Sequence, residues 1–142
     1  MSKNTCRVHV GRLMEIDVIG GYKTVDDVDA MIGMIRAELA RVPAGARVVI
    51  AADWRPCTVF TPAVADRAVA MLTGPVPRIE RSAILHLKDH ATSVLQVFRL
   101  LKEAHFEGRR VFTVASEMEA WLEEVLTPEE RTRLHTFLSL RA

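Results

Sequence analysis

The stretch R-V-V-I-A-A, residues 47–52, decides the fold class of this chain. It is short, apolar and rich in β-branched side chains, which predicts a strand that is buried on both faces. Pro43-Ala44-Gly45 ends a helical pattern directly before it. Strands buried on both faces are typical of parallel sheets that helices cover on both sides. The stretch therefore indicates an α/β domain with this strand in the middle of the sheet.

Strand-like and helix-like segments alternate on either side of the central strand. Residues 6–10 and 14–19 flank Gly11-Arg12 and predict an antiparallel hairpin. Residues 24–42 carry apolar side chains three and four positions apart, as an amphipathic helix does. After the central strand we expect two more strands, over residues 82–87 and 110–114. We expect four more helices, over about 61–72, from Asp89 or Thr92 to Gly108, over 116–125 and over 127–138.

Capping motifs mark the expected starts of the helices. Thr24–Asp27, Ser116–Glu119 and Thr127–Glu130 each have the hydroxyl and the acidic residue of a capping box. Thr61-Pro62 places a hydroxyl at the N-cap and a proline at the first helical position. The resulting order, ββαβαβαβαα, predicts a mostly parallel five-stranded sheet with an N-terminal antiparallel hairpin and helices covering it. We expect a single domain over residues 1–142, with residues 1–5 flexible.

Composition excludes several classes of function. The chain has 142 residues, with 19 basic and 18 acidic side chains and a net charge of +1, whereas a nucleic-acid binder should show a basic excess. No apolar run approaches the roughly 20 residues of a membrane span, and the first residues lack the apolar part of a secretory signal. Cys6 and Cys57 are too few for a disulfide framework. We expect a cytoplasmic protein with free thiols.

Four stretches carry a likeness to a known family: I-D-V-I-G-G-Y at 16–22, V-D-D at 25–27, V-V-I-A-A-D-W-R at 48–55 and S-A-I-L at 82–85. With the order of elements, they resemble the STAS domain of bacterial anti-sigma-factor antagonists and the related SpoIIAA-like (STAS/SEC14-like) small proteins. The resemblance spans about residues 6 to 126. It implies a STAS-like fold and a regulatory or scaffold role in bacterial signalling, exerted by protein–protein interaction.

The same resemblance suggests two phosphorylation candidates. In the antagonists, a serine in an Asp-Ser motif is phosphorylated where the helix after the central strand begins. The equivalent stretch here, Phe60-Thr61-Pro62-Ala63, has no Asp-Ser pair. Thr61 is the hydroxyl at the matching helix start, and Thr58 lies three residues before it. Thr61 is equally well explained as a helix cap, which stabilises a helix by about 1 kcal/mol.

The loop after the central strand collects the binding candidates: Asp53, Trp54, Arg55, Cys57 and Phe60. Ligands of open parallel sheets favour the crevice beyond the carboxyl ends of the strands, where this loop should lie. Arg55 would present its guanidinium to an anionic group or pair with Asp53. Trp54 would be an interface anchor or would cover the edge of the core. Binding and structural interpretations of the loop therefore both stand.

The sequence contains no assembled catalytic set. His86, Asp89 and His90 lie where a strand ends, so the two histidines do not share a helical face as zinc ligands would. Gly20-Gly21 stands alone and forms no phosphate loop. We therefore expect no metal, no cofactor and no enzymatic activity. A cysteine- or histidine-dependent enzyme, with Cys57 as nucleophile, is the least favoured alternative.

Two functions remain as hypotheses. The first is a non-enzymatic module that binds another protein through the Asp53–Thr61 loop and its helix faces, without nucleic acid or membrane span. It would form a homodimer, because the first strand is expected at an open edge of the sheet. The alternative is a small-molecule or lipid-binding domain that uses the crevice near Trp54 and Arg55.

Overall fold

The structure, a computed structural model, describes residues 3–57, 60–73, 78–87, 95–96, 99, 102 and 108–140. In this part of the chain five strands form one sheet in the order β1-β2-β3-β4-β5. Their bounds are β1 (Thr5–Val10), β2 (Leu13–Asp17), β3 (Val48–Asp53), β4 (Ile79–Leu85) and β5 (Arg109–Phe112). The first pair is antiparallel and every other neighbouring pair is parallel. The predicted α/β class, hairpin and central strand are confirmed.

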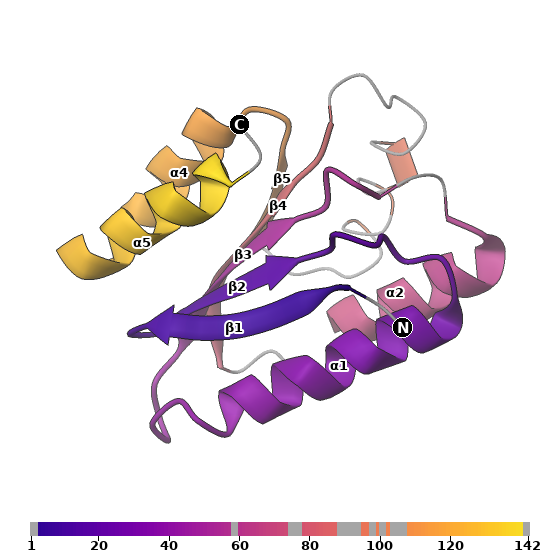
Figure 1. Cartoon of the computed structure of the whole chain (residues 1–142), viewed down its shortest axis with the longest axis horizontal. Helices are drawn as coiled ribbons and strands as arrows, with labels where there is room; N and C mark the ends of the chain where they lie inside the picture. The colour runs from indigo at the N-terminus through magenta and orange to yellow at the C-terminus, as the bar shows by residue number, and fades with distance from the viewer. Residues whose placement is uncertain are drawn as a thin grey trace.

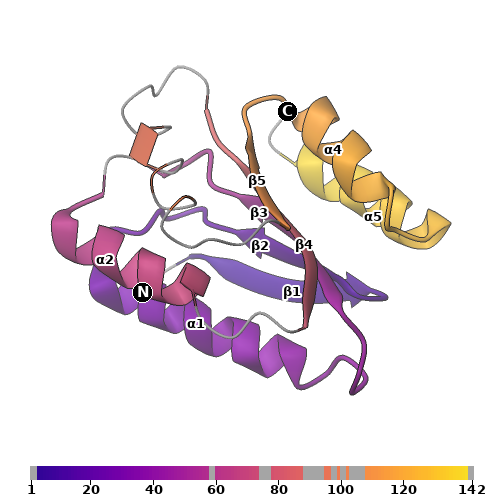
Figure 2. The same cartoon turned by 180° about the vertical axis from the view of Figure 1, so that it is seen from behind.

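The described helices cover both faces of this sheet. They are α1 (Val25–Leu39), α2 (Pro62–Thr73), α4 (Ala115–Glu123) and α5 (Pro128–Ser139). Figures 1 and 2 show α1 and α2 on one side of the sheet and α4 and α5 on the other. Leu95 and Gln96 are helical, but most of the helix expected between β4 and β5 lies outside the described residues.

Alternate residues of β3 face the two helical layers. Ile50 and Ala52 belong to the apolar cluster beneath α1 and α2, whereas Val49 and Ala51 belong to the cluster beneath α4 and α5. All six residues of the strand are buried. This is the arrangement that the uninterrupted apolar stretch predicts, because a strand between two helical layers has no polar face.

Two of the three predicted capping boxes are confirmed. The Thr24 hydroxyl accepts a hydrogen bond from the backbone N–H of Asp27, and the Asp27 carboxylate accepts one from the Thr24 N–H. Thr127 and Glu130 form the same reciprocal pair at α5. The box predicted at Ser116–Glu119 is wrong. The N-cap of α4 is Val114, two residues before Ser116, and it has no side-chain cap, so Ser116 already lies inside the first turn.

Helix α5 is joined to the N-terminal hairpin by buried carboxylates. Glu130 accepts a hydrogen bond of 2.7 Å from the backbone N–H of Arg12, in the hairpin turn. Gly11 in the same turn has φ of 56°, and a Cβ on it would lie 2.3 Å from the Glu130 carboxylate. Glu15 of β2 accepts two hydrogen bonds, of 2.6 and 2.8 Å, from the guanidinium of Arg133. Residues 118 positions apart thus hold one another in place.

The start of the chain differs from the expectation of a flexible end. Asn4 is buried, donates to the carbonyl of Gly21 at 3.0 Å and accepts from the N–H of Gly20 at 2.8 Å. Thr5 already belongs to β1. In the part of the chain that the structure describes, no helix has both the length and the apolar character that crossing a bilayer requires.

Candidate functional site

The loop after β3 is braced by an ion pair between Asp53 and Arg55. Asp53 is buried, and one of its oxygens accepts from the Arg55 backbone N–H at 3.0 Å and from Nε at 2.9 Å. Its second oxygen accepts from Nη2 at 2.9 Å. The pairing that the sequence left open is therefore confirmed. The Arg55 guanidinium is turned back onto its own loop and does not line the cavity described below.

The aromatic residues of this region are buried together. Trp54 is 2% exposed and packs edge-on against Tyr22 and Phe60, with ring centroids 5.4 and 6.0 Å apart. The three rings fill the edge of the sheet at the carboxyl ends of the strands, where we expected an open crevice from the sequence. Trp54 therefore covers the edge of the core, the structural alternative considered for it, and also contributes to the wall of a cavity.

The remaining candidates have structural explanations or fall outside the described residues. Cys57 is fully buried, and burial raises the pKa of its thiol to about 12, so it carries no thiolate at neutral pH. Thr61 is exposed, and its hydroxyl accepts from the N–H of Val64 at 3.3 Å as a helix cap does. Thr58 and the potential ligands Asp89 and His90 lie outside the described residues. Phosphorylation at Thr58 or Thr61 stays a prediction.

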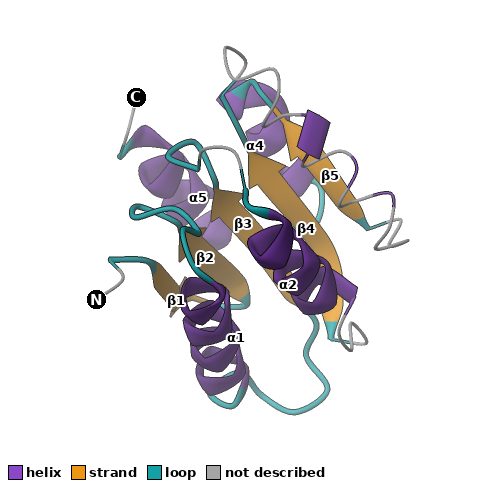
Figure 3. Ribbon diagram, turned by 90° about the vertical axis from the view of Figure 1, so that its right-hand side faces the viewer, coloured by secondary structure: helices purple, strands orange, loops and turns teal. Residues whose placement is uncertain are grey.

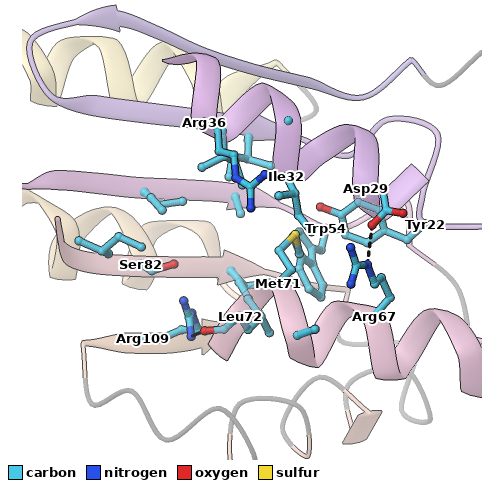
Figure 4. Close-up of a pocket in the computed structure, with 18 residues that line it drawn as sticks. Tyr22, Asp29, Ile32, Arg36, Trp54, Arg67, Met71, Leu72, Ser82 and Arg109 are labelled. Atoms are coloured by element: carbon cyan, nitrogen blue, oxygen red, sulfur yellow. Dashed lines mark hydrogen bonds and ion pairs between the residues drawn. The ribbon is translucent and has the colours of Figure 1, made fainter. Parts of the chain in front are cut away.

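A cavity of about 450 Å³ lies between α1 and α2, above the sheet (Figure 4). Figure 3 shows the two helices side by side on one face of the sheet. The lining joins apolar side chains from three strands and both helices to a few polar ones. The lining residues that carry a charge or a hydroxyl are Tyr22, Asp29, Arg36, Arg67, Ser82 and Arg109.

One face of α1 forms the first wall of the cavity. Asp29, Ile32, Gly33 and Arg36 are spaced three, four and seven positions from the first, so they share one side of the helix. Gly33 widens the cavity at the middle of this wall. A Cβ at this glycine would meet no heavy atom of the described residues within 4 Å, apart from the backbone of its own helix and its chain neighbours. Packing therefore does not require a glycine here.

The floor of the cavity follows from the register of the strands. Ile50, Ser82 and Arg109 are direct neighbours across β3, β4 and β5. The next row towards the carboxyl ends contains Ala52 and Ile84. Neighbouring positions in one row point to the same face. The floor therefore changes from polar at Ser82 and Arg109 to apolar one step further along the strands.

The two ends of the cavity differ in character. Arg36 lies in the last turn of α1, which runs antiparallel to the strands, and Arg109 is the first residue of β5. Trp54 and Tyr22 lie at the opposite end, after β3 and before α1. Figure 4 shows Arg36, Ser82 and Arg109 towards one end and the two aromatic residues towards the other. We call these the basic end and the aromatic end.

Arg109 is a buried cation at the basic end. It is 8% exposed, and Nη1 donates to the carbonyl of Leu72 in the last turn of α2 at 3.1 Å. Burial lowers the pKa of its guanidinium to about 10, because a charge is less stable away from water. The side chain is therefore still a cation at neutral pH. It also places a positive charge at the helix end where carbonyl groups accumulate negative potential.

Asp29 and Arg67 form an ion pair near the aromatic end. The carboxylate of α1 and the Nε of α2 are 2.5 Å apart, and both side chains are about half exposed. The dashed line in Figure 4 marks this link between the two helices. The opposite charges of Asp29 and Arg67 cancel, so the pair adds no net charge to the cavity. Among the described lining residues three arginines thus face one aspartate, and the excess positive charge comes from Arg36 and Arg109 at the basic end.

The sequence identified only one residue of this cavity, Trp54. It missed the others because the lining comes from elements that are far apart along the chain. One local signal was present: a glycine in the interior of the predicted helix 24–42. It breaks the helical pattern at a position that the structure places on the cavity wall.

Comparison with known proteins found no matching family model, no matching curated protein and no matching solved structure.

Proposed function

We propose that this chain is a non-enzymatic binding module that holds a small molecule in the cavity between α1 and α2. The cavity itself carries the proposal. Its volume of about 450 Å³ lies within the roughly 300–1,000 Å³ typical of ligand pockets. Like those pockets, it combines mostly apolar walls with a few converging polar groups.

The chemistry of the polar groups favours binding over catalysis. Arg36 and Arg109 carry guanidinium groups, which donate hydrogen bonds to anions and have no acceptor with which to take a proton. Asp29 is committed to Arg67. Ser82 supplies a hydroxyl, but nucleophilic catalysis needs a base beside it, and the carboxylate among the described lining residues, Asp29, is paired with Arg67. The set suits recognition and orientation of a ligand.

We further propose a STAS-like domain that passes the state of this site to a protein partner in the bacterial cytoplasm. The order of elements supports the family proposal. Leu87 and Val114 support the partner proposal, because both are large apolar residues with considerable exposure and follow β4 and β5 at one edge of the sheet. Exposed apolar groups gathered on one edge are typical of interaction sites.

Methyl NMR with a fragment library of neutral, anionic and cationic compounds tests the binding proposal. We expect some fragments to shift the methyl signals of Ile32 and Met71, which line the cavity, and to leave those of Leu134, a buried residue of α5 on the other face of the sheet, unchanged. Gly33→Leu places a larger side chain on the cavity wall, at a position where a Cβ meets no described heavy atom within 4 Å, and should abolish these shifts. A library in which no compound shifts the two cavity methyls would refute the function.

A further inference from the structure

We infer that the ligand of this cavity is an amphipathic anion, with its acid group at the basic end and its apolar part directed to the aromatic end. The inference rests on the proposed function and adds the chemical class and the orientation of the ligand. Four features of the cavity support it: Arg36, the Ser82–Arg109 corner, the Asp29–Arg67 pair and Gly33.

Arg36 supplies the accessible charge. It is exposed, and its guanidinium makes no ion pair or hydrogen bond with any other described residue. Figure 4 shows its side chain leaving α1 towards the cavity. A guanidinium offers up to two parallel hydrogen bonds to a carboxylate or a phosphate. Within the cavity it is therefore the natural first contact for an acid group.

Ser82 and Arg109 supply the buried part of the same end. They are direct neighbours in the sheet, so a hydroxyl donor lies beside a cation on the cavity floor. The cost of burying the Arg109 charge is expressed in its lowered pKa. An anion placed there would favour the charged form of this guanidinium and would itself gain from the low local dielectric constant.

The aromatic end has no comparable attraction for an anion. Asp29 neutralises Arg67 across the mouth, and the surface below the pair is formed by Trp54, Tyr22 and Ile84. An acid group at this end would meet an ion pair whose charges cancel, so it would gain no net attraction there. The charge distribution therefore favours one orientation of an amphipathic anion and disfavours the reverse.

Gly33 provides the space between the two ends. A glycine in a helix interior costs about 1 kcal/mol relative to alanine, and neither positive φ nor close packing explains it here. Any larger residue would narrow the passage between the basic and the aromatic end. An elongated ligand that spans both ends gives this glycine a role.

Binding of simple octyl compounds tests the ligand class. Octanoate and octyl phosphate carry the two anionic head groups that a guanidinium recognises, and octan-1-ol is the neutral control with the same chain. In a Trp121→Phe background, Trp54 on the cavity wall is the remaining tryptophan, and its fluorescence reports occupancy. We expect both anions to bind at least about tenfold more tightly than octanol, as a charge-assisted contact gives.

Two charge variants test the orientation. Arg36→Ala removes the accessible guanidinium and should remove most of the preference for anions, while octanol binding stays within about twofold. Lys23→Ala removes an exposed positive charge just before α1 that does not line the cavity, and it should keep the preference. Affinity should also rise about fourfold for each methylene added from hexanoate to octanoate.

The outcomes separate this inference from the proposed function. If octanol binds wild-type protein as tightly as the anions do, or if the preference survives in Arg36→Ala, the inferred ligand class is wrong while the cavity remains a binding site. The same holds if fragments bind and no octyl compound does. If no fragment shifts the cavity methyls, the proposed function fails, and the inference fails with it. A preference between the two anions identifies the head group.

Discussion

Arg55 shows how one side chain can decide between a structural and a binding interpretation of a loop. Its guanidinium and its backbone N–H all donate to the buried carboxylate of Asp53. We predict that Arg55→Ala lowers the free energy of unfolding by about 3 kcal/mol, because it leaves a buried carboxylate without its counter-ion. Urea denaturation measures the loss.

Arg55→Lys is the matched control for this variant. It keeps the charge but loses the planar fork that contacts both oxygens of Asp53, so an intermediate loss is expected. An Arg55→Ala variant that is as stable as wild type but binds a protein partner more weakly would contradict the stabilising role of the Asp53–Arg55 pair. It would favour the interpretation of the loop as an interface.

The two cysteines make stability sensitive to alkaline pH. Burial raises the pKa of both the Cys6 and the Cys57 thiol to about 12, from a value of 9.0 when exposed. Above pH 9 the unfolded chain releases these protons and the folded chain retains them. The thiols' contribution to stability is therefore fully present below pH 9 and is lost as pH rises from 9 to about 12.

We predict a steeper alkaline loss of stability in wild type than in a Cys6→Ala, Cys57→Ala double variant. Denaturation midpoints at pH 8, 9 and 10 measure it, each compared with the variant's own value at pH 8. Parallel curves for the two proteins would show that the thiols do not titrate on unfolding in this range.

At the scale of an element, α1 contains a glycine that the fold does not need. We predict that Gly33→Ala raises the free energy of unfolding by about 0.5–1 kcal/mol, because alanine is the better helix former and its Cβ meets open space. Gly11→Ala is the contrasting control. It has positive φ and its Cβ would contact Glu130, so it should lower stability by more than 1 kcal/mol. An unchanged or lower midpoint for Gly33→Ala would contradict the prediction.

The helix starts show what local sequence can and cannot predict. Thr24 and Thr127 cap their helices because each is followed by an acidic residue that returns the hydrogen bond. Ser116 has the same spacing to Glu119, yet α4 begins at Ala115. Met118 and Trp121 of this helix pack in the core beneath α4 and α5. Tertiary packing of the helix outweighed a cap that stabilises by about 1 kcal/mol.

At the scale of the whole molecule, the order of strands and helices along the chain was predictable from the sequence, and the cavity was not. A period of two or of three to four residues, with glycine and proline between segments, is a local signal, so the α/β class followed from the sequence. The cavity depends on the juxtaposition of Arg36, Ser82 and Arg109 across three elements. The register of β4 against β5 brings Ser82 and Arg109 together, and the sequence of either strand alone does not determine that register.

Self-association through the edge strand β1 is also a property of the whole molecule. β1 lies at an open edge of the sheet, as expected, and edges pair readily with other strands. The homodimer stays a prediction, which light scattering at high micromolar concentration can check. The N–H of Val8 on this edge already donates to the Glu38 carboxylate at 3.0 Å, so a β1-mediated dimer would pair through the other backbone groups of the strand. A monomeric wild-type protein at that concentration would contradict the prediction.

The contact between α5 and the hairpin bears on the timing of synthesis. A ribosome makes the Gly11–Arg12 turn early, but the carboxylate of Glu130 that receives the turn's N–H is made more than a hundred residues later. Contacts this distant along the chain slow folding, since a large loop must close before they form. Until α5 emerges, Leu13 and Val49 lack its cover, and part of this apolar face of the nascent sheet is exposed. Translation stalled before Glu130 should therefore yield chains that depend on chaperones for solubility.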